Sequence, residues 1–191
     1  TLSCVFFLEL KRAYDITPRV SSTSLHSRSI SLSLSHSLSL PLSLSPSLSL
    51  SLSLSLSLFE NFLTLFTRYS DMRIVIDHCM KPQIRNHSVD GFTHWADGMS
   101  RLADQTTAYC KYSGLVTESD GWSLEKMRPY VEHLLKVFGS ERLMWGSDWP
   151  VCRLEASYDA RHSAARALTA DLPKAAQDRV YGGTAKKFYR L

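Results

Sequence analysis

The segment Arg73-Ile74-Val75-Ile76-Asp77-His78 decides the fold class of this chain. Three β-branched apolar residues in succession, followed by polar residues, predict a strand that is buried on both faces. Strands of this kind are typical of parallel sheets that are covered by helices on both sides. Lys81-Pro82 then breaks the chain. The segment therefore predicts an α/β domain built around a parallel sheet.

Helical and strand patterns alternate on both sides of this strand. Apolar residues at helical spacing come before it, and the same alternation continues to the C-terminus. The predicted elements are helix 60–73, strand 73–78, helix 94–105, strand 107–112, a helix from Ser123 to Phe138 that stops at Gly139, strand 142–145, and helices 155–169 and 173–190 with a break at Gly182-Gly183. Such alternation predicts parallel strands joined by crossover helices, in about three βα units.

The N-terminal third has a different composition. Ser and Leu alternate almost without exception over residues 29–58, a pattern that a CT dinucleotide repeat in the gene would produce. A strand of this length is far outside the usual range, and a serine at every second position is too polar for a membrane-spanning helix. We therefore expect residues 1–58 to be a disordered low-complexity segment without function, and residues 59–191 to form the folded domain.

Composition limits the possible partners and the compartment. The chain has 191 residues, of which 44% are hydrophobic and 21% charged, and a formal net charge of +4 without a basic block. We expect a soluble protein that binds neither nucleic acid nor a membrane. Cys79, Cys110 and Cys152 lie in or just after predicted strands and show no paired spacing, so we expect buried free thiols and a cytoplasmic location.

Polar side chains follow each predicted strand. Asp77-His78 follow the first strand, Lys111 and Ser113-Gly114 end the second, and Ser147-Asp148-Trp149 follow the third. Chemistry in parallel α/β folds gathers at the carboxyl ends of the strands. Asp148 could accept a proton from water or bind a cation, and His78 could carry a proton, contact substrate or bind a metal. A turn aspartate and a hydrogen-bonded core histidine would give the same pattern.

Further residues near these strand ends are weaker candidates. Cationic, acidic and aromatic side chains there could bind a substrate, although solvated lysines and core tryptophans are equally compatible with the sequence. The candidate substrate-binding residues are Lys81, Lys111, Glu118, Trp122 and Trp149. Neighbouring residues of a strand face opposite ways, which favours a structural role for Asp77 beside His78.

Four blocks of residues 60–191 resemble the amidohydrolase-related hydrolases, in particular the branch of sugar-lactone and 2-pyrone-4,6-dicarboxylate lactonases. The blocks are Ile74-Val-Ile-Asp-His-Cys-Met-Lys-Pro82, Lys111-Tyr-Ser-Gly-Leu-Val-Thr-Glu118, Arg142-Leu-Met-Trp-Gly-Ser-Asp-Trp-Pro-Val151 and Gly183-Thr-Ala-Lys-Lys-Phe-Tyr-Arg-Leu191. The resemblance implies that the three strands are the sixth to eighth of a TIM (β/α)8 barrel.

The same resemblance implies the chemistry. Asp148 matches the family aspartate that serves as general base in lactone hydrolysis, and His78 matches a histidine that polarises the substrate carbonyl. In metal-dependent members these two residues would also bind a divalent cation such as zinc, which activates water and acts as a Lewis acid. No organic cofactor is implied. The implied substrate is a small molecule, a sugar lactone or a similar ring.

The sequence also departs from the family pattern. It has no His-x-His pair, which ends the first strand of family members, and the Ser-Leu tract stands where five strands would be. We therefore expect this chain alone to be an incomplete and inactive fragment, whose open sheet edges favour self-association. The alternatives are a decarboxylase of the same superfamily and a non-catalytic remnant.

Overall fold

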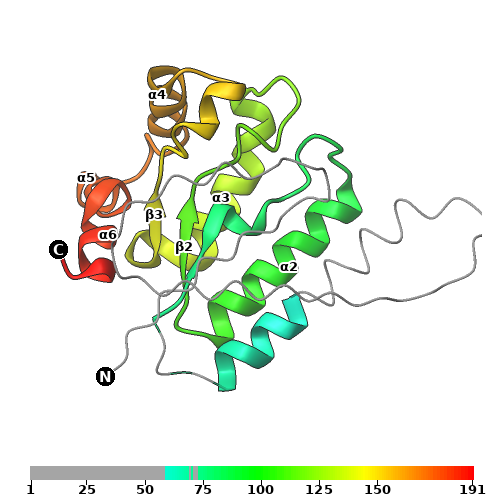
Figure 1. Cartoon of the computed structure of the whole chain (residues 1–191), viewed down its shortest axis with the longest axis vertical. Helices are drawn as coiled ribbons and strands as arrows, with labels where there is room; N and C mark the ends of the chain where they lie inside the picture. Colours follow the sequence, from blue (N-terminus) through cyan, green and yellow to red (C-terminus); the bar gives the residue numbers. More distant parts are fainter. Residues whose placement is uncertain (1–58, 69, 71–72) are drawn as a thin grey trace, which may run out of the picture.

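The computed structural model of the protein describes residues 59–68, 70 and 73–191 (Figure 1). The disorder expected for residues 1–58 lies outside these ranges. A three-stranded parallel sheet forms the centre, in the order β1 (Val75–Ile76), β2 (Tyr109–Tyr112) and β3 (Leu143–Trp145). In the register Ile76 lies opposite Cys110, and Cys110 lies opposite Leu143. The predicted α/β class with a parallel sheet is confirmed.

Helices follow each strand, as the alternation predicted. Residues 59–68 are helical, and the remaining helices are α2 (Val89–Gln105), α3 (Leu124–Arg142), α4 (Tyr158–Leu168), α5 (Lys174–Asp178) and α6 (Thr184–Tyr189). Helix α2 begins earlier than predicted because the Ser88 hydroxyl accepts a hydrogen bond from the Gly91 amide, 3.0 Å away, and caps it. The predicted cap of α3 is confirmed, since the Ser123 hydroxyl accepts from the Lys126 amide.

Different helices pack against the two faces of the sheet. Ile76, Cys110 and Leu143 belong to the main core, which they share with α2, α3 and the helix over 59–68. On the other face Val75 and Met144 pack against Phe188 of α6. Successive residues of each strand point to opposite faces of the sheet. Each strand is therefore buried on both sides where helices cover it.

The first strand is shorter than predicted and ends in an unusual turn. Residues 77–80 form a tight turn in which His78 and Cys79 have left-handed backbone angles, with φ of 47° and 51°. The turn is fastened to the core, because the Trp95 indole donates to the Cys79 carbonyl at 2.8 Å and the Cys79 thiol donates to the Lys111 carbonyl at 3.0 Å. The alternation of side chains between the two faces therefore ends with the strand at Ile76. Asp77 and His78 lie in the turn and need not point to opposite sides.

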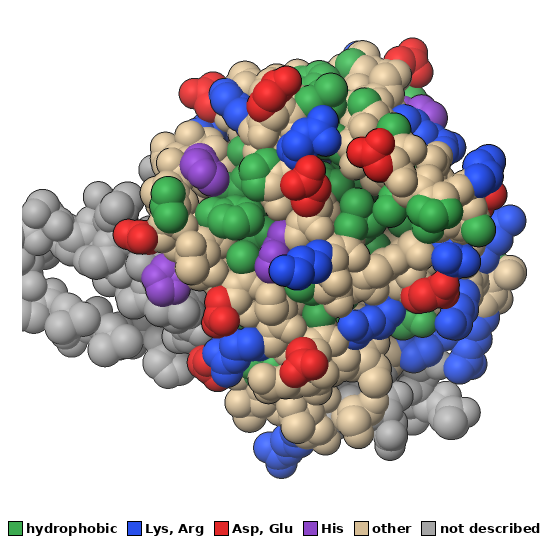
Figure 2. Space-filling model, turned by 180° about the vertical axis from the view of Figure 1, so that it is seen from behind, with side chains coloured by type: hydrophobic (Ala, Val, Ile, Leu, Met, Phe, Trp, Pro, Cys, Tyr) green, Lys and Arg blue, Asp and Glu red, His purple; other side chains and the backbone are tan. Residues whose placement is uncertain are grey.

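The surface is mixed in charge. Lysine and arginine side chains gather over the end of the domain formed by α5 and α6 (Figure 2), where α6 carries exposed Lys186 and Lys187 in its last turn. Positive charge at that end of a helix is favourable for the helix dipole. Of the helices that the structure describes, none has the length and apolar character needed to cross a membrane. The three cysteines of the described region are buried free thiols, as predicted.

Candidate functional site

Three charged or ionisable side chains from two strand ends meet at the carboxyl edge of the sheet. The His78 Nε2 atom lies 3.7 Å from Asp148 Oδ1 and 3.6 Å from Asp77 Oδ2. All three side chains are largely buried, so water screens their charges only weakly. The structure thus brings together the two residues that the sequence singled out, and it adds Asp77 to them.

Asp77 links this group to a cation. The Lys111 ammonium lies 3.2 Å from Asp77 Oδ1, while the other carboxylate oxygen faces His78. The interpretation of Asp77 as a residue facing away from His78 is therefore wrong. The cause is the left-handed turn at His78. Because His78 does not continue the strand, its ring lies on the same side as the Asp77 carboxylate.

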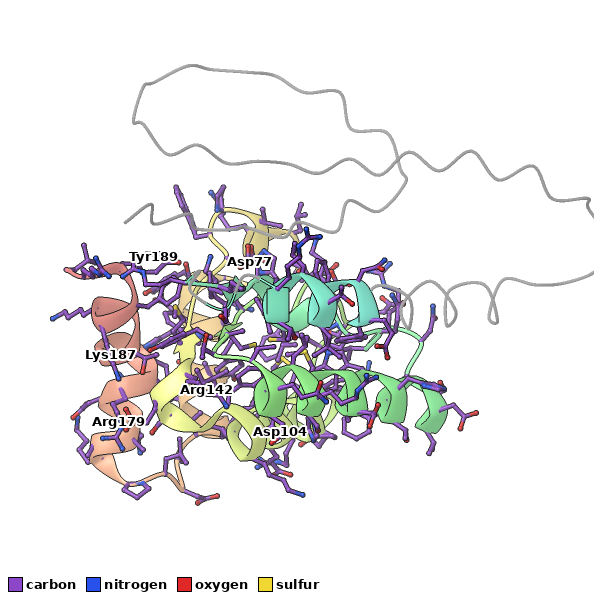
Figure 3. All side chains as sticks on the ribbon, turned by 90° about the horizontal axis from the view of Figure 1, so that it is seen from below. Asp77, Asp104, Arg142, Arg179, Lys187 and Tyr189 are labelled. Atoms are coloured by element: carbon purple, nitrogen blue, oxygen red, sulfur yellow. The ribbon has the colours of Figure 1, made fainter. Side chains whose placement is uncertain are left out.

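The C-terminal helix lies close to the same carboxylate. Burial first, and the negative charge of Asp77 second, raise the pKa of the Tyr189 phenol. In Figure 3 Asp77 and Tyr189 lie on one side of the domain, and α2 and α3 lie on the other. Helix α6 therefore borders the site from the sheet face that carries Val75 and Met144.

Ser113 and Gly114 hold the His78 ring from the neighbouring strand end. The Ser113 hydroxyl lies 2.9 Å from His78 Nδ1 and is buried. Gly114 has a φ of +72°, and a Cβ atom there would come within 2.8 Å of the same Nδ1. A side chain at this position would displace the ring, and only glycine adopts this backbone conformation without strain.

Asp148 is held by the loop after β3. Its backbone is also left-handed, with φ of 57°, and its carbonyl accepts a hydrogen bond from the Cys152 amide at 2.8 Å. Arg161 of α4 donates from Nη2 to the Gly146 carbonyl at 2.9 Å, just before Asp148. Burial lowers the pKa of the Arg161 guanidinium, and the charge of Asp148 opposes this shift. The buried arginine is thus close enough to Asp148 to act on it electrostatically.

The remaining predicted residues lie on the loops that follow the strands. The Lys81 amide ends the left-handed turn by donating to the His78 carbonyl at 2.8 Å. Glu118 is buried in the loop after β2, and its amide donates to the Gly114 carbonyl. Trp122 donates from Nε1 to the Glu155 carbonyl at 3.2 Å. Trp149 is 63% exposed, so it does not line a closed pocket in this structure.

Three residues of the site, Asp77, Ser113 and Arg161, were absent from the predicted site residues. Ser113 carries a sequence signal, since it follows β2 as His78 follows β1. Arg161 carries none, because it lies in the middle of a helix whose pattern does not distinguish an inward arginine from an exposed one. Its burial, at 4% exposure, appears only once α4 packs against the sheet.

The donor set does not make a complete divalent-cation site. Although Asp77, His78 and Asp148 meet here, the described ranges hold no group of three His, Cys, Asp or Glu side chains with the geometry of metal ligands. His78 and Asp148, the two predicted ligands, do face each other, but the adjacent carboxylate of Asp77 is already paired with the Lys111 ammonium. A cation at that position competes with a metal ion for the same oxygen atoms.

Known proteins resemble this chain in sequence. An L-fucono-1,5-lactonase from Burkholderia ambifaria is 38% identical over 138 residues, which are 68% of this chain and 45% of that protein. The chain thus spans less than half the length of this curated relative.

Solved structures resemble it in fold. An amidohydrolase from Burkholderia multivorans, crystallised with bound zinc, has a TM-score of 0.67 at 33% identity, and the likeness covers 71% of this chain and 50% of that one. A probable 2-pyrone-4,6-dicarboxylic acid hydrolase from Acinetobacter baumannii has a TM-score of 0.59 at 19% identity, with the same coverage, and shows likeness of fold alone.

Most of the chain also matches a known protein family. Residues 42–191 match the amidohydrolase family, so the match includes every strand and helix described above. The similarity to the L-fucono-1,5-lactonase agrees with the lactonase-like branch. By its sequence and by the fold of its described residues, this chain belongs to the amidohydrolase family.

Proposed function

We propose that this domain hydrolyses a lactone ring, contrary to the expectation from the sequence that the chain alone is inactive, with Asp148 as general base and His78 as the group that polarises the carbonyl. The single observation that carries the proposal is the approach of His78 Nε2 to within 3.7 Å of Asp148 Oδ1 at the carboxyl edge of a parallel sheet. Opening a lactone needs a base for the attacking water and a donor for the carbonyl oxygen. The pair offers both, side by side.

The reaction can be written with these side chains alone. The Asp148 carboxylate accepts a proton from water as the water oxygen attacks the lactone carbonyl carbon. The carbonyl oxygen becomes negative, and a proton on His78 Nε2 stabilises it by a hydrogen bond. The carbon–oxygen bond of the ring then breaks, and the leaving alkoxide takes the proton back from Asp148. The product is a hydroxy acid, and the enzyme returns to its starting state.

The candidate substrate-binding residues complete the proposal. Lys111 lies in the site through its ion pair with Asp77, and a cation there would attract the carboxylate or hydroxyl groups of a substrate. Lys81, Glu118, Trp122 and Trp149 lie on the loops that follow the strands, where substrate specificity of parallel α/β enzymes resides. A sugar lactone is the proposed class of substrate, supported by the similarity to the fuconolactonase.

The proposed architecture is the sixth to eighth βα units of a TIM barrel. Support comes from the parallel order β1-β2-β3 and from the likeness to one half of the Burkholderia multivorans amidohydrolase. In such a barrel the carboxyl ends of all strands form one active-site face. His78 and Asp148 would then face the centre of that ring.

Hydrolysis of L-fucono-1,5-lactone by the purified full chain tests the proposal. Acid release is followed with a pH indicator and compared with spontaneous hydrolysis. Asp148→Asn keeps the shape of the side chain but removes the base, and the rate should fall by about 100-fold or more. Asp104→Asn is the matched control, since Asp104 is exposed and lies on the opposite side of the domain from Asp77 (Figure 3).

Two outcomes contradict the proposal. One is a folded wild-type chain that does not accelerate lactone opening over the spontaneous rate. The other is an Asp148→Asn variant that retains the wild-type rate. An equal loss in Asp104→Asn would point to general damage to the fold, and circular dichroism of each variant separates that case from a loss of the base.

A further inference from the structure

The His78 ring has two nitrogen atoms in very different surroundings. Nδ1 lies 2.9 Å from the Ser113 hydroxyl, a hydrogen-bond distance. Nε2 faces two carboxylates, Asp77 and Asp148, at 3.6 and 3.7 Å. A neutral imidazole carries one proton, and the hydrogen bond at one nitrogen decides which nitrogen holds it.

Electrostatics determine the favourable arrangement. A bare lone pair on Nε2 would point at two negatively charged groups, whereas an N–H at that position would be attracted by both. Nδ1 then keeps its lone pair and needs a donor. The Ser113 hydroxyl can rotate to supply one, because its hydrogen is free to turn.

We infer that Ser113 is a positioning residue that holds the proton of neutral His78 on Nε2, by donating its own hydroxyl hydrogen to Nδ1. The inference rests on the proposed function, in which Nε2–H stabilises the carbonyl oxygen of the lactone. Without Ser113 the ring could place its proton on Nδ1, and His78 would then offer no donor to the substrate. Ser113 acts through His78 and need not touch the substrate.

Close packing fixes the position of the Ser113 side chain. Ser113 is 2% exposed at the carboxyl end of β2, between the ends of β1 and β3. A Cβ atom on Gly146 of the β3 end would lie 3.4 Å from the Ser113 Cβ, so the two strand ends are in contact there. Gly114 then leaves room for the imidazole against the backbone. The serine and the ring are thus held by neighbouring strands rather than by mobile side chains.

The backbone of His78 is fixed as well. Its amide donates to Asp77 Oδ1 at 3.2 Å, and its carbonyl accepts from the Lys81 amide at 2.8 Å. With the main chain held at both sides, the ring has little freedom beyond rotation about its own bonds. The Ser113 hydrogen bond removes that rotation and selects the tautomer.

Nitrogen spectroscopy of the full chain tests the inference without requiring turnover. The chain is labelled with ¹⁵N-histidine, and long-range ¹H–¹⁵N correlations report which ring nitrogen carries the proton. The sequence contains seven histidines, so the His78 signal is identified by its loss in His78→Gln. Wild type should carry the proton on Nε2, Ser113→Ala should shift a large share to Nδ1, and Ser113→Thr should restore Nε2–H.

Lactone hydrolysis supplies the second readout. Ser113→Ala should lower kcat roughly tenfold with a smaller change in KM, which is the effect of losing a partner that orients a catalytic histidine. Ser119→Ala is the matched control, because Ser119 is equally buried but donates to the Val116 carbonyl at 3.0 Å, away from His78. Amide spectra of each variant verify that the fold is intact.

The two proposals fail in different ways. An unchanged tautomer in folded Ser113→Ala overturns the positioning role, whatever the activity. A tautomer that shifts in Ser113→Ala, in a chain that hydrolyses no lactone, upholds the positioning role and contradicts the proposed function. If Ser113→Thr does not fold, the comparison of Ser113→Ala with Ser119→Ala still decides the question.

Discussion

Arg161 of α4 donates a hydrogen bond from Nη2 to the carbonyl oxygen of Gly146, 2.9 Å away, and so ties a helix to the end of β3 just before Asp148. Because the guanidinium is buried, its removal leaves the partly buried Gly146 carbonyl without this charged donor. The contact therefore links the stability of the domain to the position of the proposed base.

Replacing this arginine should destabilise the domain. Arg161→Met keeps most of the side-chain volume but removes the donor, and the free energy of unfolding should fall by about 1–3 kcal/mol. Urea denaturation followed by circular dichroism measures the change, and the m-value should stay constant. The rate of lactone opening should fall as well, since the loop that carries Asp148 loses its anchor.

An exposed arginine provides the control for this prediction. Arg128 of α3 makes an ion pair with Glu132 at 3.7 Å on the helix surface. Arg128→Met should change the free energy of unfolding by less than about 0.5 kcal/mol, because exposed pairs contribute little. Equal effects of the two variants would mean that the contact with Gly146 does not stabilise the domain.

Gly114 should not tolerate alanine. Its positive φ alone costs an L-residue about 1–2 kcal/mol, and the added methyl group would also collide with the His78 ring. We expect Gly114→Ala to lose both stability and lactone hydrolysis. Thermal unfolding and the indicator assay measure the two effects on the same protein.

Gly121 provides a control that separates the backbone strain of an alanine at positive φ from its steric collision with a neighbouring side chain. Gly121 has a φ of +58°, but no atom lies within 4 Å of a Cβ built there. Gly121→Ala should therefore carry the strain of the backbone and keep the activity. If Gly114→Ala were no more harmful than Gly121→Ala, the close packing of Gly114 against His78 would be unimportant.

The sequence predicted the sheet and helices well because their signals are local. The run Ile74-Val75-Ile76 predicts a strand by its own composition, and Ser123 predicts a helix start by its side-chain oxygen. Strand ends of a parallel sheet lie on one edge, so the meeting of His78 and Asp148 was also within reach of the sequence.

The parts that the sequence missed depend on tertiary packing. The left-handed turn after Ile76 is held by Trp95 and Lys111, which are distant in the chain, and no local rule predicts it. Asp77 joins the site only because of that turn. Arg161 is inward-facing only because α4 packs against β3, which its helical pattern does not specify.

Burial of His133 predicts how stability depends on pH. Burial lowers the pKa of the His133 ring below its usual 6.5, and the nearby positive charge of Lys136 acts in the same direction. The Ala96 carbonyl, 2.8 Å from Nε2, opposes the shift but does not cancel it. The unfolded chain therefore takes up a proton at a higher pH than the folded domain does.

The sign of the effect follows from this difference in proton uptake. Above the unfolded pKa neither state holds the proton, and the contribution of His133 is fully present. As the pH falls below about 6.5, the unfolded state is protonated first, so stability is lost until the lower pKa of the folded state is passed.

His133→Gln removes this titration, and its amide can still donate to the Ala96 carbonyl. Urea midpoints at about pH 7.5 and about pH 5.5 should therefore differ less in His133→Gln than in wild type. An equal difference in both proteins would show that burial of this ring does not contribute to acid sensitivity.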